Sequence, residues 1–350
     1  MLVFGDSLSD SGNASALTQS PTPPVPGLTS YYPPSGPSPI PGDTRGIPYD
    51  FRFSNGPVAS EYLAQMLKLP PSLPAWPAVS ASSPNYAVGG AMTGTRSLGS
   101  APTSGNYSWA IDDPLGLQGL YPAVQNTGLD AQVALFATRV GTAAVSFDPA
   151  TTLFSVWGGA NDIFLGVNLA AKGEMIDFDG LVISAASNVA NRIGELASLG
   201  GTHFLVINLP DLGLTPFAIA LGPDVQAELT DISEGFNLAL KSALAYFDGS
   251  GLDIIEFDAF SEFQALIASA EAQGFITDEP CFNGVASLPT VLEGCPGYVF
   301  FDPVHPTTYS HSLIAASLYR ALPEPSIPAL LVAALFAIAP VRRKRRRLPT

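Results

Sequence analysis

The chain has 350 residues, 47% of them hydrophobic, so it is long and apolar enough to bury a full core, and we expect one large globular domain. It carries 30 acidic residues against 15 Lys and Arg, and six of these cations stand together at residues 342–347. The rest of the chain is strongly acidic and repels phosphate, because nucleic-acid binding needs clustered Lys and Arg. We therefore exclude nucleic acid as a partner.

The first predicted strand begins at Leu2 and stops at Gly5, which is followed by Asp6 and Ser7. Gly, Asp and Ser are common turn residues, so a plain polar turn is one interpretation of this boundary. The other is that the turn presents Ser7 for chemistry. Residues 21–48, rich in Pro, Gly and Ser, then indicate a long surface loop, and a helix with apolar spacing follows at about 57–67.

Later segments alternate between apolar strands and amphipathic helices. Helices are predicted at about 178–199 and 223–247, and they lead into continuous apolar strands within 203–210 and 252–260. Unbroken apolar strands joined by helices are typical of parallel βαβ units whose sheet is covered on both faces. The sequence therefore predicts an α/β fold, a three-layer α/β/α sandwich with a central parallel sheet.

Two glycine pairs follow candidate strands. Gly89 and Gly90 come after a short apolar run, which marks a place where the backbone closely approaches another group. Residues 152–162 predict a buried strand that ends in a second Gly-Gly turn, with Asn161 two residues after the second glycine. Ligands of parallel sheets bind beyond the carboxyl ends of the strands. We therefore expect Ser7, the first glycine pair and Asn161 to meet at one edge of the sheet.

A serine nucleophile needs a base, usually a histidine oriented by a carboxylate, and the chain holds three histidines. His203 begins a predicted strand, so we expect it at the opposite end of the sheet in a structural role. His311 falls one to two turns into an apparent helix and is also a weak candidate. His305 is left as the favoured base.

His305 follows Asp302 by three residues in "FFDPVHPTTYSH", on a turn stiffened by two prolines. A carboxylate at this spacing can accept the Nδ1 proton of the imidazole and leave Nε2 free for Ser7. The alternative is an exposed Asp-His turn without function. The G-x-S-x-G elbow of α/β-hydrolases is absent from the sequence, so a serine hydrolase here would be of another kind.

The dispersed motifs resemble, in order, the blocks of the GDSL or SGNH lipase/esterase family. The resemblance covers about Leu2 to Leu322, and a further stretch resembles the secreted esterase and plant-type branches of the family. Its fold implies a flavodoxin-like sandwich for residues 1–322. The family blocks are "FGDSLSDSGN", "NYAVGGA", "GGAND" and "DPVHPT", and the branch stretch is "RFSNGPVASEYLA".

The resemblance implies a serine esterase or lipase that needs no metal and no other cofactor. Ser7 would attack the ester carbonyl, His305 would transfer the proton and Asp302 would orient His305. The substrate would be a lipid, an aryl ester or an acetylated glycan. Alternatives are a carbohydrate O-deacetylase of the same fold and a non-catalytic surface or matrix binding protein, although a binding role would not need all three residues.

The resemblance also implies an oxyanion hole. Its donors would be the backbone N–H groups of Ser7 and Gly90 and the side-chain amide of Asn161, because glycine lets a backbone N–H approach where a side chain would block it. Alignment of the short block leaves Gly89 as the alternative to Gly90.

The two cysteines, Cys281 and Cys295, are too few and too far from histidine to compose a zinc site. A disulfide that closes this short loop is the favoured interpretation, and it implies an oxidising compartment. The alternative is a pair of buried free thiols.

The C-terminal residues 323–350 combine Pro-Glu-Pro, an apolar run of about fifteen residues and the cation cluster. The run is shorter than the ~20 residues that a membrane-spanning helix needs, so it fits a marginal membrane segment whose cations stay in the cytoplasm. This order resembles a PEP-CTERM sorting signal, which exosortase-type enzymes process. It implies an exported protein, transiently anchored in the inner membrane and then at the cell surface or outside. We find no secretory signal before Leu2, so we expect either a protein that stays inside the cell or, if it is exported, a start upstream of Met1.

Overall fold

The computed structural model describes residues 1–19, 33, 49–76, 83–94, 96–98, 101–103, 105–106, 124–283 and 287–323. Most of the predicted loop at 21–48 and the tail from residue 324 lie outside the described residues. No helix within the described ranges is long and apolar enough to cross a membrane. In chain order the elements are β1 (Leu2–Gly5), α1 (Asn13–Thr18), α2 (Ala59–Met66), β2 (Leu73–Pro74), β3 (Pro84–Asn85), β4 (Arg96–Leu98), β5 (Ala101–Thr103), α4 (Leu129–Gly141), β6 (Leu153–Trp157), α5 (Ala160–Ala171), α6 (Phe178–Ser198), β7 (His203–Ile207), α7 (Pro216–Leu221), α8 (Pro223–Leu244), β8 (Asp253–Phe257), α9 (Ala259–Ala272), α10 (Leu288–Leu292) and α11 (Thr308–Ala321).

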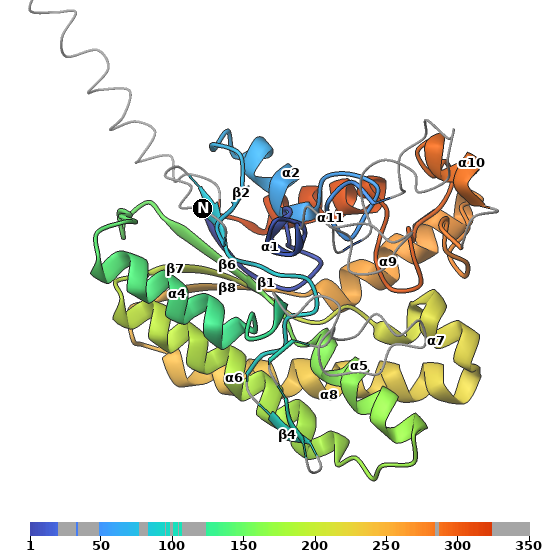
Figure 1. Cartoon of the computed structure of the whole chain (residues 1–350), viewed down its shortest axis with the longest axis horizontal. Helices are drawn as coiled ribbons and strands as arrows, with labels where there is room; N and C mark the ends of the chain where they lie inside the picture. The colour runs from blue at the N-terminus through green and yellow to red at the C-terminus, as the bar shows by residue number, and fades with distance from the viewer. Residues whose placement is uncertain are drawn as a thin grey trace, which may run out of the picture.

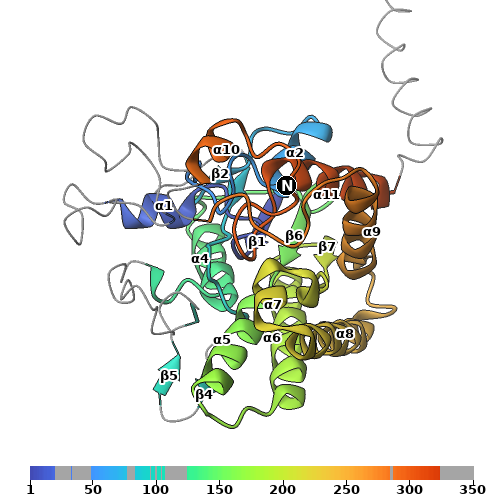
Figure 2. The same cartoon turned by 90° about the vertical axis from the view of Figure 1, so that its right-hand side faces the viewer.

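The central sheet has six strands in the order β2-β3-β1-β6-β7-β8, and every pairing in it is parallel. Helices α4, α6 and α8 lie on one face, whereas α2, α9 and α11 lie on the other (Figure 1). The short hairpin β4–β5 stands apart from this sheet in the turned view (Figure 2). The predicted α/β sandwich with a parallel central sheet is confirmed.

The inner strands β1, β6 and β7 are mostly apolar because both of their faces are buried, whereas the edge strand β8 carries the exposed residues Asp253 and Glu256. In β7, Phe204 and Val206 join the core shared with α4, α6 and α8, whereas Leu205 and Ile207 join the core shared with α2 and α11. Successive side chains of a strand point to opposite faces, so a strand that is covered on both faces favours apolar residues at consecutive positions. This is the physical reason for the unbroken runs in the sequence.

Several predicted boundaries were too generous. The predicted strand at 252–260 ends at Phe257, and α9 begins at Ala259; the helix predicted to reach residue 247 ends at Leu244 and closes with a 3₁₀ turn. Helix α5 begins at Ala160, so Asn161 lies in the first turn of a helix rather than in a loop. A helix N-terminus leaves backbone N–H groups unpaired, so this end of α5 provides positive potential beside the sheet edge.

The carboxyl end of β1 is fixed by a glycine and a glutamine. A Cβ at Gly5 would lie 2.1 Å from the carbonyl oxygen of Trp157 on the neighbouring strand, so no side chain fits there. The side chain of Gln132 on α4 accepts from the Gly5 N–H (2.9 Å) and donates to the Gly5 carbonyl (2.7 Å). The main chain that leads into Ser7 is therefore held from both sides.

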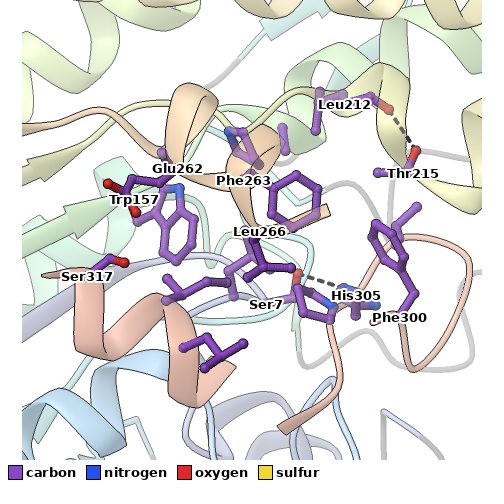
Figure 3. A pocket seen from close by; sticks show the side chains of 18 of the residues that line it. Ser7, Trp157, Leu212, Thr215, Glu262, Phe263, Leu266, Phe300, His305 and Ser317 are labelled. Atoms are coloured by element: carbon purple, nitrogen blue, oxygen red, sulfur yellow. Dashed lines mark hydrogen bonds between the residues drawn. The ribbon is translucent and has the colours of Figure 1, made fainter. Parts of the chain in front are cut away.

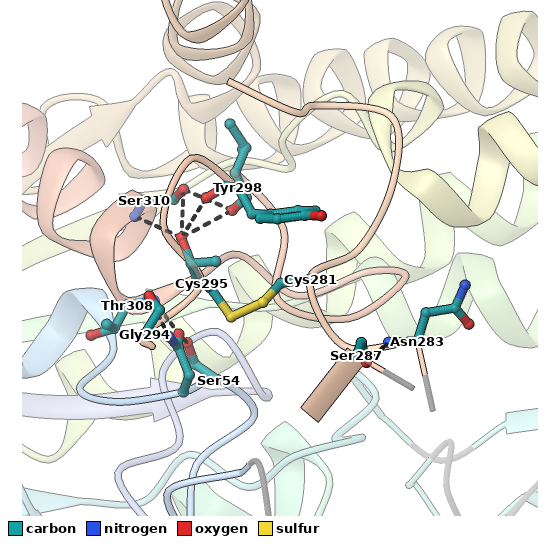
Figure 4. The surroundings of a disulfide bond; sticks show 12 residues. Ser54, Cys281, Asn283, Ser287, Gly294, Cys295, Tyr298, Thr308 and Ser310 are labelled. Carbon is teal, nitrogen blue, oxygen red and sulfur yellow. Dashed lines mark hydrogen bonds between the residues drawn. A yellow bond between two sulfur atoms is a disulfide. The ribbon is translucent and has the colours of Figure 1, made fainter. Parts of the chain in front are cut away.

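Cys281 and Cys295 form the predicted disulfide, shown with its surroundings in Figure 4. Both cysteines are buried in a small cluster with Phe301. The Cys281 N–H donates to the Phe300 carbonyl (3.0 Å), and the Phe282 N–H donates to the Phe301 carbonyl (2.7 Å). The disulfide loop is thus bonded to the main chain that directly precedes Asp302.

Replacing both cysteines by serine should lower the free energy of unfolding by about 3 kcal/mol, because a cross-link that closes a loop of this length restricts the unfolded chain. Urea denaturation of the wild type and of the Cys281→Ser/Cys295→Ser variant measures the difference. Reduced wild type is the control and should unfold at the same urea concentration as the variant. Equal midpoints for the oxidised wild type and the variant would contradict this prediction.

Candidate active site

Ser7, His305 and Asp302 form a continuous chain of hydrogen bonds. Ser7 follows β1, and the other two residues lie on the loop that precedes α11. The Ser7 Oγ lies 2.8 Å from His305 Nε2, and His305 Nδ1 lies 2.7 Å from Asp302 Oδ2 (Figure 3 shows the first contact). With Nδ1 donating to the carboxylate, Nε2 is the acceptor for the Ser7 hydroxyl, which is the arrangement that a general base needs.

Asp302 is buried and fully hydrogen-bonded. Its Oδ1 accepts from the backbone N–H groups of Val304 (3.0 Å) and His305 (2.8 Å), and its Oδ2 accepts from the Tyr49 hydroxyl (2.8 Å). Burial acts to raise the pKa of Asp302, but the charge and hydrogen bond of His305 and the two N–H donors lower it below its usual value. Asp302 is therefore an anion at neutral pH and can only accept from the imidazole.

Tyr49 joins Asp302 to the disulfide region. Its ring stands edge-on to Phe301 (4.8 Å between centroids) and to Phe282 (5.9 Å), both from the segment that the disulfide closes or borders. Such edge-to-face pairs fix the orientation of a ring as well as burying it. The phenol is thereby aimed at the carboxylate.

The segment "RFSNG" holds the loop of His305 from the other side. Ser54 Oγ donates to the Pro306 carbonyl (2.9 Å), and Asn55 Oδ1 accepts from the Thr308 N–H (2.9 Å). The ring of Phe53 packs against the His305 imidazole at 5.3 Å between centroids. Residues 52–56 belong to the stretch that resembles the secreted and plant-type branches of the family. Their contacts position the start of α11 and the imidazole of His305.

Gly90 and Asn161 line the same cavity as Ser7. The Asn161 amide donates to the Ala91 carbonyl (3.0 Å), and Gly90 has a φ of 80°, a conformation that side chains strongly disfavour. The N–H of Gly89 instead donates to the Asp10 carboxylate (2.9 Å). The two adjacent glycines therefore have different surroundings.

Asp10 connects the loop of Ser7 to the glycine pair. Besides the Gly89 N–H, its carboxylate accepts from the N–H groups of Gly12 (2.8 Å), Asn13 (2.5 Å) and Ala14 (3.1 Å). Burial raises the pKa of Asp10 to about 6, and the four N–H donors act against this rise. This role of Asp10 was not predicted from the sequence, although Asp10 lies within the motif "FGDSLSDSGN".

Asp6 is the second buried carboxyl of this loop and lines the cavity. It accepts from the Leu8 N–H (3.0 Å). Burial raises the pKa of Asp6 to about 7, the Leu8 N–H and the charge of His305 oppose the rise, and the charge of Asp162 adds to it. Asp162 itself accepts from the N–H and hydroxyl of Thr93 (both 2.9 Å), which anchors α5 to the chain beyond the glycine pair.

The other two histidines lie away from Ser7. His203 begins β7, so it lies at the amino ends of the parallel strands, whereas Ser7 follows the carboxyl end of β1, and it pairs with Asp253 at 3.0 Å. His311 is completely buried between α11 and α2, where its Nδ1 accepts from the Ala59 N–H (3.3 Å). Burial, with a smaller effect of the His305 charge, lowers the pKa of His311 to about 3, so this imidazole stays neutral. Within the described ranges no group of three His, Cys, Asp or Glu could hold a metal ion.

The site opens into a cavity of about 400 Å³. Ser7 and His305 lie on its wall, and Figure 3 shows Trp157, Phe263, Leu266 and Phe300 among the side chains around them. Most of the remaining lining is aliphatic or aromatic. The arrangement can therefore hold an uncharged, apolar molecule beside a hydroxyl that is hydrogen-bonded to a base.

Comparisons with known proteins agree with this geometry. The chain is 26% identical to the thermolabile hemolysin of Vibrio parahaemolyticus over 226 residues, which cover 61% of this chain and half of the hemolysin. It is 27% identical over 341 residues to one GDSL esterase/lipase of Arabidopsis thaliana, covering 91% of this chain and 81% of the plant protein. A second Arabidopsis GDSL esterase/lipase is 23% identical over 336 residues, covering 91% and 87%. Residues 1–318 match the GDSL-like lipase/acylhydrolase family, so the chain belongs to this family of carboxylic ester hydrolases.

Proposed function

We propose that the protein is a serine esterase or lipase that works through an acyl-enzyme. The Ser7 Oγ attacks the ester carbonyl carbon while His305 Nε2 takes the hydroxyl proton. The C–O bond to the alcohol then breaks, and His305 returns the proton to the leaving oxygen. A water, deprotonated by the same imidazole, hydrolyses the acyl group from Ser7 and regenerates the hydroxyl. The observation that carries the proposal is the hydrogen-bond chain from Ser7 through His305 to Asp302.

The negative charge that develops on the carbonyl oxygen needs fixed donors. We assign this role to the N–H groups of Ser7 and Gly90 and to the Asn161 amide, which line one cavity. Gly90 is preferred to Gly89 because the Gly89 N–H already donates to Asp10. The Asn161 side chain is held at the first turn of α5 by its bond to the Ala91 carbonyl.

We further propose that the enzyme is exported and that residues 323–350 form a PEP-CTERM-type sorting tail processed by an exosortase-type enzyme at the inner membrane. The disulfide supports export, because such bonds persist in oxidising compartments outside the cytoplasm. The order of proline-bracketed Glu324, apolar run and cation cluster supports the tail. Residues 1–322 would then form the catalytic domain.

Ser7→Ala should lower kcat for p-nitrophenyl ester hydrolysis by about 10⁴-fold or more, because it removes the nucleophile. Ser11→Ala is the matched control. The Ser11 hydroxyl is buried on the same loop and has no hydrogen-bond partner within the described residues, so activity should persist. His305→Ala should be as inactive as Ser7→Ala, and His203→Ala should stay active. A folded Ser7→Ala protein with more than a few per cent of wild-type activity would place the nucleophile elsewhere.

Asn161→Ala should lower kcat by about 10²–10³-fold with little change in KM, because an oxyanion donor acts mainly on the transition state. Steady-state kinetics on the same ester separate the two constants. Asn168→Ala on the same helix is the control, since the Asn168 amide donates to the Phe164 carbonyl (2.9 Å). A variant whose KM rises while its kcat stays unchanged would contradict the assigned role.

Tyr49→Phe should lower kcat/KM about tenfold, in line with the loss of one hydrogen bond to a charged group. The Asp302 carboxylate, with one donor fewer, should hold the protonated imidazole more strongly and move the acid limb of the pH–activity profile to higher pH. Tyr62→Phe is the control, because the Tyr62 hydroxyl bonds to Thr308 Oγ1 (2.8 Å) rather than to Asp302. An unchanged acid limb in Tyr49→Phe would mean that the phenol does not act through Asp302.

A further inference from the structure

The cavity at Ser7 continues into a groove between α9 and α11. Phe263, Leu266 and Ala270 line it from α9, and Leu313 and Ser317 line it from α11. Within each helix, these residues are three or four positions apart, so they lie on one face of that helix. The two helices therefore face one another across a space that their side chains leave partly open.

The groove has a direction relative to the reacting atoms. His305 lies just before α11, so the end of the groove near Tyr309 is close to the site, and Arg320 lines it eleven residues further along the helix. At 1.5 Å per residue this path is about 16 Å long. In Figure 3, Glu262 and Ser317 lie at the side of the cavity away from His305.

Polar side chains border the groove along both helices, at Glu262 and Ser269 of α9, at Gln273 directly after α9, and at Ser317 and Arg320 of α11. Between them the lining is apolar, with Phe263, Leu266 and Ala270 from α9 and Leu313 from α11. Leu313 keeps 40% of its surface exposed and Tyr309 keeps 47%, although both border this groove. Large apolar side chains left uncovered beside a cavity are typical of a surface that binds an apolar ligand.

We infer that this groove is the subsite for a linear alkyl chain in the acyl part of the substrate, so that the enzyme prefers esters of medium or long fatty acids. The inference rests on the proposed role of Ser7. The leaving oxygen takes its proton from His305 and is drawn toward the imidazole, while the groove leads from Ser7 away from it. The part of the substrate that stays bonded to Ser7 therefore occupies the groove.

If the groove binds the acyl chain, kcat/KM should depend on the length of that chain. Each fully buried methylene raises kcat/KM by up to about fourfold. We expect p-nitrophenyl octanoate to exceed the acetate by about 10²-fold or more, with the increase ending once the chain outgrows the groove. A site for acetylated glycans would give the opposite order, because an acetyl group leaves the groove empty.

Ala265→Trp and Ala268→Trp test the location of the subsite. Both alanines are exposed on α9, three residues apart, but only Ala265 lines the cavity in the described part of the chain. Ala265→Trp should lower the octanoate-to-acetate ratio of kcat/KM by at least about tenfold, and Ala268→Trp should keep the wild-type ratio. A ratio does not depend on the fraction of folded enzyme, so a partly misfolded variant is still informative.

The outcomes separate this inference from the proposed function. A wild-type enzyme that hydrolyses all of the esters with a flat dependence on acyl length, or an unchanged ratio in Ala265→Trp, would overturn the groove while leaving Ser7 in its role. Alkyl acetates of increasing alcohol length form a second series. A length dependence in that series alone, lost in Ala265→Trp, would overturn the assignment to the acyl part. Failure of the wild type to hydrolyse any ester would overturn the proposed function and the groove with it.

Discussion

The geometry of the site depends on the hydrogen bonds that the carboxylate of Asp10 accepts. This carboxylate is buried, and it accepts hydrogen bonds from four backbone N–H groups that belong to the start of α1 and to the glycine pair. An ionised carboxylate is costly to bury unless its oxygens are satisfied, so these partners are held together by the cost of separating them. The side chain of Asn13 adds two bonds, to the carbonyls of Asn85 (2.7 Å) and Ala87 (2.8 Å). Gly90 therefore keeps a fixed position relative to Ser7.

A second framework positions the base, and it joins the loop of His305 to residues 49–55 and to the disulfide loop. The disulfide loop is bonded to the main chain before Asp302, Tyr49 donates to the carboxylate, and Ser54 and Asn55 hold the residues that follow His305. The two frameworks meet at the 2.8 Å contact between Ser7 and His305, which are 298 residues apart in the sequence. Each framework is held in place by its own contacts. The Ser7 hydroxyl and the His305 imidazole are therefore brought together by the surrounding structure rather than by their single hydrogen bond.

The parallel sheet could be predicted from the sequence, and so could the choice of Ser7, Asp302 and His305 as candidate site residues. Strand patterns and short polar motifs are local, so they can be recognised in a sequence. The sequence did not predict the roles of Asp10 or Tyr49, because their partners are 79 and 253 residues away and because backbone N–H donors leave no mark in a sequence. The groove was equally hidden. Leu266, Ala270 and Leu313 look like core positions of ordinary amphipathic helices, and a space between two helices cannot be seen in either one alone.

The central claim is that Ser7 carries the acyl group, and covalent labelling tests it most directly. An activated serine hydroxyl attacks the phosphorus of an alkyl phosphonate ester and displaces its leaving group, and peptide mass spectrometry then locates the phosphonyl adduct. We predict one adduct per chain, on the peptide that contains Ser7, formed in step with the loss of esterase activity and absent in the His305→Ala variant. Loss of activity with the adduct on any other residue, or equal labelling of Ser7 in His305→Ala, would contradict the account.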